Sequence, residues 1–323
     1  MNKMRIVITR PLPGDTVAML KKVGFQNVWC PEADEPLPRP QLLKAAAGAH
    51  AIITNPGDKP IDAEVFDAAG DQLMVVSNFA VGVDNIDVEE ARRRGIVVCN
   101  TPTPVTEPTA DIAWLLLLGA ARRAHEAQRL ARSGQWTGIG PSMLLGRKVL
   151  GKTLFIIGAG RIGTAVARRS IGWQMEVLYH DVDRSETIEQ PPINAGRVDL
   201  DEGLKEADFV SLHTPLLPET RHLINAERLA LMKESAILIN TSRGPVVDEA
   251  ALVEALNGGR LAAAGLDVYE QEPKIHPELI ALDNVFLMPH IGSATIEDRA
   301  WMTQLTVDNA IAVLKGEDPP HAV

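Results

Sequence analysis

One stretch of this chain decides its fold, Thr153-Leu-Phe-Ile-Ile-Gly158-Ala-Gly160-Arg-Ile-Gly163. Its apolar run, Leu154 to Ile157, is typical of a buried strand, and it leads directly into glycines spaced G-x-G-x-x-G. In this motif the first glycine permits a tight turn, the second lets the backbone approach a pyrophosphate, and the third lets the next helix pack on the strand. Because the N–H groups that open such a helix attract phosphates, the stretch predicts a dinucleotide site.

A second strand supports this interpretation. The run Glu176 to His180 follows the predicted helix and ends at Asp181. In dinucleotide-binding folds, a carboxylate about 20 residues beyond the glycines meets the ribose hydroxyls of NAD. A carboxylate would repel a 2′-phosphate, so NAD(H) is the preferred cofactor, while Arg184 nearby keeps NADP(H) open.

Composition narrows the class of protein. A length of 323 residues favours two domains, and 46% hydrophobic and 23% charged residues are ordinary for a folded chain. A net charge of −10 argues against nucleic acid or an anionic membrane as partner. Cys30 and Cys99 form neither a metal-binding spacing nor a disulfide framework, so no metal is expected. The apolar run Ile112 to Ala121 is about half of the ~20 residues that a span requires, and we expect a cytoplasmic protein.

The first hundred residues alternate short β-type runs with helical segments. Such alternation predicts a mostly parallel sheet covered on both faces. The proline-rich segment Pro31 to Pro40 is expected to be a surface connection. The predicted strands are Arg5–Thr9, Ala51–Thr54, Leu73–Ser77 and Ile96–Cys99, and the predicted helices are Val17–Val23, Asp62–Ala69 and Val88–Arg94.

A change of composition at Thr101-Pro-Thr-Pro-Val-Thr-Glu-Pro108 marks a domain boundary. One long helix is predicted beyond it, from Thr109 to Arg132, with Thr106 as a cap and Pro108 in the first turn. Residues 113–118 are apolar around the whole helix, which demands burial on several sides. This helix is expected in the core, and a subunit interface stays open as an alternative.

Four further strands are predicted in the second half of the chain, and polar clusters follow them. In an open doubly wound α/β sheet the carboxyl ends of the strands face the ligand, so these clusters should converge on the cofactor. The helix predicted for Thr295–Lys315 is expected to return to the first domain. The strands are Asp208–His213, Ala236–Asn240, Ala262–Asp267 and Asn284–Met288, and the clusters are His213-Thr-Pro215, Thr241-Ser-Arg243-Gly, Asp267 and His290-Ile-Gly-Ser293.

Three ionisable residues among these segments form a coherent site for hydride transfer, Arg243, Glu272 and His290. A guanidinium matches the planar oxygens of a 2-keto acid, and a histidine can give a proton to the developing alkoxide. A carboxylate beside that histidine favours the imidazolium and orients it. Each residue alone has an ordinary structural explanation, and it is their occurrence together after a dinucleotide motif that favours a catalytic role.

The order of four motifs resembles a known family. The motifs are Gly158-Ala-Gly-Arg-Ile-Gly163, Asn240-Thr-Ser-Arg-Gly244, Gly265-Leu-Asp-Val-Tyr-Glu-Gln-Glu-Pro273 and Pro289-His-Ile-Gly-Ser-Ala-Thr295. Together they are similar to those of the D-isomer-specific 2-hydroxyacid dehydrogenases over nearly the whole chain. Within that family the chain most resembles the glyoxylate/hydroxypyruvate reductases and 2-ketogluconate reductases, which share its segments 81–87, 133–137 and 290–295.

The resemblance implies two α/β domains. A doubly wound, parallel-sheet Rossmann domain for NAD(P) would comprise residues 101–290, and a smaller flavodoxin-like substrate domain would comprise residues 1–100 and 291–323. It also implies a homodimer, in which Trp136 of one subunit could line the substrate site of the other.

Roles for individual residues follow from the same resemblance. Arg243 would anchor the substrate, His290 would be the acid/base and Glu272 its partner, while Asn55, Val81 and Gly82 would complete the substrate site. The positions that match cofactor contacts are Thr106, Gly158, Gly160, Arg161, Ile162, Gly163, Asp181, His213, Pro215, Thr220, Thr241, Asp267, His290 and Ser293.

The expected activity is NAD(P)H-dependent reduction of glyoxylate and hydroxypyruvate to D-2-hydroxy acids. Reduction of 2-ketogluconate is an alternative, and phosphite dehydrogenases keep a similar triad. Formate dehydrogenase is disfavoured because that branch pairs its histidine with glutamine where this chain has Glu272. A different class, the NAD-binding corepressors, would need a peptide-binding surface and often extra tails, and the sequence shows neither a tail nor a disordered extension.

Overall fold

The computed structural model describes residues 3–58 and 60–323. These residues fold into two compact units, which we call unit 1 (Met1–Val105 with Ser293–Val323) and unit 2 (Thr106–Gly292). The boundaries expected from the sequence, 100/101 and 290/291, lie within a few residues of these. Unit 2 is inserted between the two segments of unit 1.

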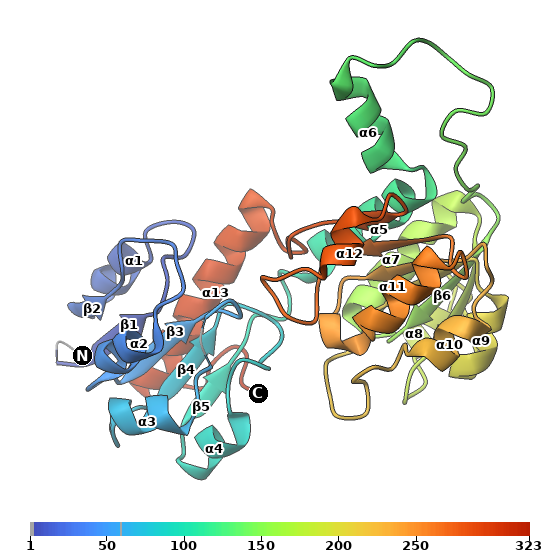
Figure 1. Cartoon of the computed structure of the whole chain (residues 1–323). Coiled ribbons are helices and arrows are strands. Elements are labelled where there is room, and N and C mark those ends of the chain that lie inside the picture. Colours follow the sequence, from blue (N-terminus) through green and yellow to red (C-terminus); the bar gives the residue numbers. More distant parts are fainter. Residues whose placement is uncertain (1–2, 59) are drawn as a thin grey trace. The chain divides into compact units, whose positions relative to one another are not determined.

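Unit 2 is built on a seven-stranded parallel sheet (Figure 1). Its strands are β6 (Thr153–Ile157), β7 (Glu176–His180), β8 (Gly196–Arg197), β9 (Phe209–Leu212), β10 (Ile237–Asn240), β11 (Ala263–Leu266) and β12 (Val285–Leu287). Their order, β12-β11-β10-β9-β6-β7-β8, changes direction between β6 and β9. A doubly wound sheet binds its ligand at such a point, so the expected Rossmann architecture is confirmed.

Alternate residues of β6 show why both faces of this sheet are covered. Leu154 and Ile156 pack into one apolar cluster with α5 (Thr106–Ala121), α7 (Arg161–Arg169) and α8 (Glu186–Glu189). Phe155 and Ile157 pack into another with α9 (Leu200–Glu206), α10 (Ala226–Leu231), α11 (Glu249–Asn257) and α12 (Pro277–Ala281). Successive strand residues point to opposite faces, so a continuous apolar run belongs to a strand buried on both sides.

Unit 1 contains a five-stranded parallel sheet in the order β2-β1-β3-β4-β5, which is the flavodoxin-like order. Its elements are β1 (Arg5–Ile8), α1 (Thr16–Lys22), β2 (Asn27–Trp29), α2 (Arg39–Ala46), β3 (Ala51–Thr54), α3 (Ala63–Ala69), β4 (Val75–Asn78), α4 (Val88–Arg93), β5 (Val97–Cys99) and α13 (Ile296–Lys315). Val307 and Leu314 of α13 pack with Ile6 and Ile8 of β1, so this late helix covers one face of the sheet, as expected.

Three sequence-based predictions of local structure are wrong. The single helix expected over residues 109–132 is two helices, α5 and α6 (Ala124–Ser133), because Arg123 adopts a left-handed backbone with φ of 52° and pairs its guanidinium with Glu126. Thr106 is the first residue of α5 rather than its cap. In addition, α2 begins inside the proline-rich segment, with Pro40 in its first turn.

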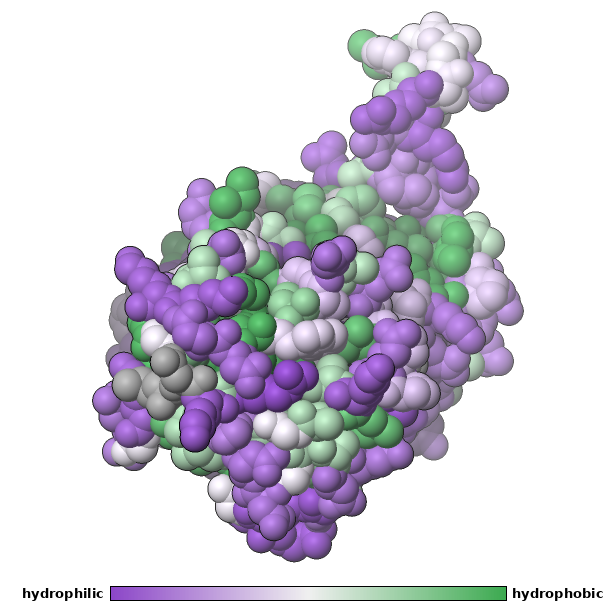
Figure 2. Space-filling view, turned by 90° about the vertical axis from the view of Figure 1, so that its left-hand side faces the viewer, coloured by the Kyte–Doolittle hydropathy of each residue, from purple (hydrophilic) through white to green (hydrophobic). Residues whose placement is uncertain are grey.

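The segment that follows α5 extends from unit 2. Figures 1 and 2 show α6 and the loop beyond it standing clear of the unit, with a hydrophilic helix and a less polar tip. Ile139 is 93% exposed and Leu145 66% exposed in this loop. We call residues 124–146 the arm. No helix among residues 3–58 and 60–323 is both long and apolar enough to cross a membrane.

Candidate active site

The glycine-rich turn between β6 and α7 is shaped by close packing at two of its three glycines. Gly158 has φ of 96°, and a Cβ there would lie 2.7 Å from the His213 carbonyl. A Cβ on Gly163 would lie 2.0 Å from the oxygen of Gly158, so the helix packs as closely as the motif predicts. A Cβ on Gly160 would meet no atom within 4 Å. The second glycine therefore leaves open space beside the helix N-terminus, which fits the pyrophosphate of a dinucleotide.

Asp181, one residue beyond β7, is bonded to this turn. Its Oδ2 accepts a hydrogen bond of 2.7 Å from the N–H of Ala159. Arg184 is turned to Glu189, with an Nε–Oε2 distance of 2.7 Å. Arg197 donates to the carbonyls of Asp181 and Val182. Asp181 thus has the position that a ribose-binding carboxylate requires. The Arg184 guanidinium is paired with the carboxylate of Glu189.

Within the described residues, three of the buried side-chain polar atoms that have no hydrogen-bond partner lie at the carboxyl ends of β9 and β10. They are Nδ1 of His213, Oγ1 of Thr214 and Oγ1 of Thr241. The other ring nitrogen of His213 lies 2.8 Å from Ser211 Oγ, and burial lowers the pKa of His213 to about 3, so its ring is neutral. Unpaired buried polar groups are costly, and a polar ligand would satisfy them. The donors and the glycine turn together fit a nicotinamide dinucleotide.

Asp267 anchors the segment that carries His290. Only 1% of Asp267 is exposed, and its Oδ1 accepts a hydrogen bond of 2.8 Å from the N–H of Ile291. Burial raises the pKa of this carboxyl group, although hydrogen bonds from the N–H groups of Ile291 and Gly292 act in the opposite direction. His290 itself has a left-handed backbone, with φ of 54°. Such a conformation is uncommon outside glycine, so the segment is held in place by its surroundings.

His290 and Glu272 form a hydrogen-bonded pair. His290 Nδ1 lies 2.7 Å from Oε2 of Glu272, and the other carboxylate oxygen accepts a hydrogen bond of 2.9 Å from the N–H of Tyr269. Their side chains are 40% and 34% exposed. Since Glu272 occupies Nδ1, the ring nitrogen that remains for proton exchange is Nε2.

The turn that carries Arg243 is formed by the side chain of Asn240, the last residue of β10. Asn240 Oδ1 accepts from the N–H and the hydroxyl of Ser242, and its Nδ2 donates to the carbonyl of Arg243. A Cβ on Gly244 would lie 1.8 Å from the carbonyl carbon of Tyr269. The Arg243 turn therefore packs directly against the loop that carries Glu272.

The other predicted cofactor residues of unit 2 lie along the same edge of the sheet. Arg161 and Ile162 open α7, Thr106 opens α5, and Thr220 Oγ1 donates to the carbonyl of Pro215. Ser293 belongs to unit 1.

The predicted substrate residues Asn55, Val81 and Gly82 also belong to unit 1. Asn55 follows β3 and accepts a hydrogen bond from the N–H of Gly57, while Asn78 donates to the carbonyl of Gly82. Val81 follows β4, and its carbonyl accepts a hydrogen bond from Asn100. Their role with Arg243 and His290 stays a prediction.

Two supporting residues were missed by the sequence analysis. Asn240 shapes the Arg243 turn, and the hydroxyl of Tyr269 donates to the carbonyl of Met288, two residues before His290. Both lie inside the quoted motifs, and a strand that ends in asparagine was the available signal for Asn240. Nothing in the sequence distinguished Tyr269 from an ordinary buried aromatic residue.

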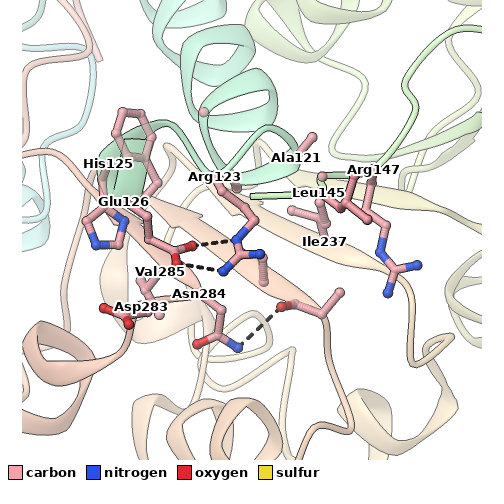
Figure 3. A pocket seen from close by; sticks show the side chains of 16 residues that line it. Ala121, Arg123, His125, Glu126, Leu145, Arg147, Ile237, Asp283, Asn284 and Val285 are labelled. Atoms are coloured by element: carbon pink, nitrogen blue, oxygen red, sulfur yellow. Dashed lines mark hydrogen bonds and ion pairs between the residues drawn. The ribbon is translucent and has the colours of Figure 1, made fainter. Parts of the chain in front are cut away.

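A surface cavity of about 270 Å³ lies elsewhere on unit 2 (Figure 3). It is lined by Ile237, Ala263 and Val285, the first residues of β10, β11 and β12, so it is at the opposite edge of the sheet from His290. Two of its charged side chains, Arg123 and Glu126, are paired with each other. The cavity is therefore separate from the predicted catalytic residues.

Comparison with known proteins agrees with this geometry. Residues 114–292 match the family model described as "D-isomer specific 2-hydroxyacid dehydrogenase, NAD binding domain". A glyoxylate reductase of Thermococcus kodakarensis is 50% identical over 323 residues, which cover 99% of this chain and 96% of that protein.

Solved structures show the same likeness. A glyoxylate reductase from Paecilomyes thermophila is 33% identical, with a TM-score of 0.89 over 100% of this chain and 99% of that one. An NADPH-dependent glyoxylate/hydroxypyruvate reductase from Sinorhizobium meliloti is 31% identical, with a TM-score of 0.85. The match covers 99% of this chain and 98% of that one. The likeness thus covers both units.

Proposed function

This chain belongs to the D-isomer-specific 2-hydroxyacid dehydrogenases and is an NAD(P)-dependent oxidoreductase, and on that basis we propose that it reduces glyoxylate and hydroxypyruvate. Where the product is chiral, we expect the D-2-hydroxy acid. The observation that carries the proposal is the His290–Glu272 pair of 2.7 Å, which lies at the same carboxyl edge of the sheet as the glycine turn. The family resemblance noted in the sequence is confirmed by the relatives.

His290 is the proton donor in this proposal. A nicotinamide dinucleotide held by the glycine turn and Asp181 would supply a hydride for the carbonyl carbon of the keto acid. Nε2 of His290 gives its proton to the carbonyl oxygen, and the C=O double bond becomes C–OH. Glu272 keeps the ring oriented through Nδ1, so that the same nitrogen always faces the substrate.

Arg243 binds the substrate in this proposal. A guanidinium can hold the carboxylate and the keto oxygen together, which draws electron density from the carbonyl carbon. Its backbone is fixed by Asn240 and by the packing of Gly244 on Tyr269, which supports a preorganised anchor. Asn55, Val81 and Gly82 of unit 1 are proposed to contribute further substrate contacts.

NAD(H) is the proposed preferred cofactor. Asp181 is already bonded to the glycine turn, where a second carboxylate oxygen can receive a ribose hydroxyl. A 2′-phosphate at this point would face that carboxylate, and Arg184 is held by Glu189. NADP(H) is therefore expected to bind more weakly.

We further propose that the protein is a homodimer in which the arm contacts a second copy. Its exposed residues Trp136, Ile139 and Leu145 are 55%, 93% and 66% exposed. Apolar side chains on an extended segment favour burial by a partner. Localisation in the cytoplasm remains an expectation from the sequence.

The deciding experiment is a spectrophotometric assay of NADH and NADPH oxidation with glyoxylate, hydroxypyruvate, pyruvate and 2-ketogluconate. Rapid turnover of glyoxylate or hydroxypyruvate that is lost in His290→Ala is the expected result. Preference for 2-ketogluconate would change the substrate but keep the chemistry. If the wild type turned over none of these acids while binding NADH, the reductase proposal would be wrong and phosphite oxidation or an NAD-sensing role would be tested next.

A further inference from the structure

The loop that carries Glu272 is attached to the His290 segment by Tyr269. The N–H of Tyr269 donates to Glu272 Oε1 over 2.9 Å, and its hydroxyl donates to the carbonyl of Met288 over 2.7 Å. Tyr269 is buried, with 4% exposed surface. The position of the Glu272 carboxylate therefore depends on where the backbone at residues 269–270 is held.

Glu270, the next residue, is held by two side chains from distant parts of unit 2. Its N–H donates to Glu249 Oε1 over 2.7 Å, and its own carboxylate is hydrogen-bonded to Nε2 of His222. Glu249 is 6% exposed at the start of α11, and burial raises the pKa of its carboxyl group. The hydrogen bond that Glu249 accepts from the Glu270 N–H gives its buried carboxyl group a polar partner.

His222 also reaches the turn that carries Arg243. Its N–H donates to the carbonyl of Pro245 over 2.8 Å, and its Nδ1 lies 4.0 Å from Asp248 Oδ2. Gly244 packs against the backbone of Tyr269 and Glu270. His222 thus connects the Arg243 turn to the Glu272 loop, although it lies 48 residues before Glu270.

The backbone of His222 is strained, with φ of 50°. A left-handed conformation is uncommon for residues other than glycine, and it persists only where the surroundings impose it. The backbone hydrogen bond from His222 to the Pro245 carbonyl belongs to these surroundings.

We propose that His222 and Glu270 are a positioning pair, which holds the Glu272 loop against the Arg243 turn. The inference rests on the proposed reductase function. Neither residue is placed on the substrate or cofactor, so their effect passes through Glu272, His290 and Arg243. A small displacement of an orienting carboxylate lowers the rate of the chemical step while cofactor binding is kept.

The test uses His222→Asn, Glu270→Ala, the double variant and Glu270→Gln. Asparagine tolerates the left-handed backbone but is too short to reach Glu270. Each single variant is expected to lower kcat for glyoxylate about tenfold, with wild-type Tm and wild-type NADH affinity by fluorescence titration. Glu270→Gln should recover most of the activity, because its amide oxygen still accepts from Nε2–H. The matched control is Glu254→Gln, on the exposed part of α11.

Coupling between the two residues is the sharper criterion. If they act as one unit, the double variant is no slower than the worse single variant. The inference would be overturned by wild-type kcat in both single variants, or by single effects that multiply in the double variant. Parallel losses of Tm, NADH affinity and kcat would also overturn it, because they indicate a purely structural role.

A second readout does not depend on turnover. The ¹H and ¹⁵N resonances of the His290 Nδ1–H group, assigned with His290→Gln, report its contact with Glu272. They should move in His222→Asn and Glu270→Ala and stay in Glu254→Gln. Unchanged resonances would refute the positioning role, whereas an inactive wild type with moving resonances would refute only the reductase proposal.

Discussion

The carboxylate of Asp181 accepts a hydrogen bond of 2.7 Å from the N–H of Ala159, in the middle of the glycine turn. This contact joins the end of β7 to the turn after β6. Asp181 is thereby fixed before any ribose arrives, and a charge that needs no rearrangement discriminates most strongly between a hydroxyl and a phosphate.

Asp181→Ala should therefore change the choice of cofactor. The loss of charged hydrogen bonds is expected to raise KM for NADH about tenfold or more, while removal of the repulsion lowers KM for NADPH. Initial rates with both cofactors measure the ratio, and Asp183→Ala, at an exposed neighbouring carboxylate, is the control. An unchanged ratio in Asp181→Ala would show that this residue does not select the cofactor.

Alanine substitutions at Gly160 and Gly163 should fail in different ways. A Cβ at Gly160 meets nothing within 4 Å, so Gly160→Ala should fold with wild-type Tm but lose NADH affinity. A Cβ at Gly163 would lie 2.0 Å from the oxygen of Gly158, so Gly163→Ala should lose stability by about 2 kcal/mol or more. Urea unfolding and NADH fluorescence separate the two effects, and equal losses of stability would contradict the assignment.

Replacement of His290 should be far more costly than replacement of its partner. His290→Ala is expected to lower kcat about 10²- to 10⁴-fold, the usual range for a general acid. Glu272→Gln keeps an acceptor for the Tyr269 N–H and should lower kcat less. Steady-state kinetics of both variants and of their combination provide the measurement. Full activity in His290→Ala would require another proton donor.

His213 should make the protein less stable in acid. Its pKa is about 3 in the folded state because of burial, against 6.5 ordinarily, so only the unfolded chain takes up a proton between these values. The stabilisation present above pH 6.5 is therefore lost as the pH falls towards about 3, by up to about 1.4 kcal/mol per pH unit.

The measurement for His213 is urea unfolding at several pH values for the wild type and for His213→Gln. The variant should lose less stability between pH 7 and pH 5 than the wild type. His125→Gln, at the surface cavity, is the control for loss of a histidine. Parallel curves for the wild type and His213→Gln would show that this ring does not titrate differently on folding.

The arm should govern assembly. Ile139→Asp places a charge on its most exposed apolar residue, which is 93% exposed, and should convert the proposed dimer into a monomer. Sedimentation velocity over a range of concentrations measures the change, with Gln135→Asp as a polar control on the same loop. A dimer that survives Ile139→Asp would place the interface elsewhere.

Local sequence was sufficient to predict the strand, turn and helix that we propose as the cofactor site. The strand before Gly158, the turn and the start of α7 depend on residues next to one another, and an apolar run followed by spaced glycines encodes them. The break between α5 and α6 depends on a backbone turn and a side-chain pair instead. Arginine favours a helix, so the left-handed turn at Arg123 could not be read from composition, and it became clear only with its Glu126 pair.

The residues that hold the candidate site in place could not be predicted from the sequence either. His222 and Glu270 come together only when the loops after β9 and β11 are folded side by side. A histidine in a polar loop carries no periodic signal, so the three predicted catalytic residues could be named from motifs while their supports could not.

The divided composition of unit 1 has a consequence for biosynthesis. Val307 and Leu314 cover apolar residues of β1, yet a ribosome makes them some three hundred residues later. One apolar face of the first sheet therefore stays uncovered throughout the synthesis of unit 2. During that interval the exposed apolar residues of this sheet are a binding site for a chaperone.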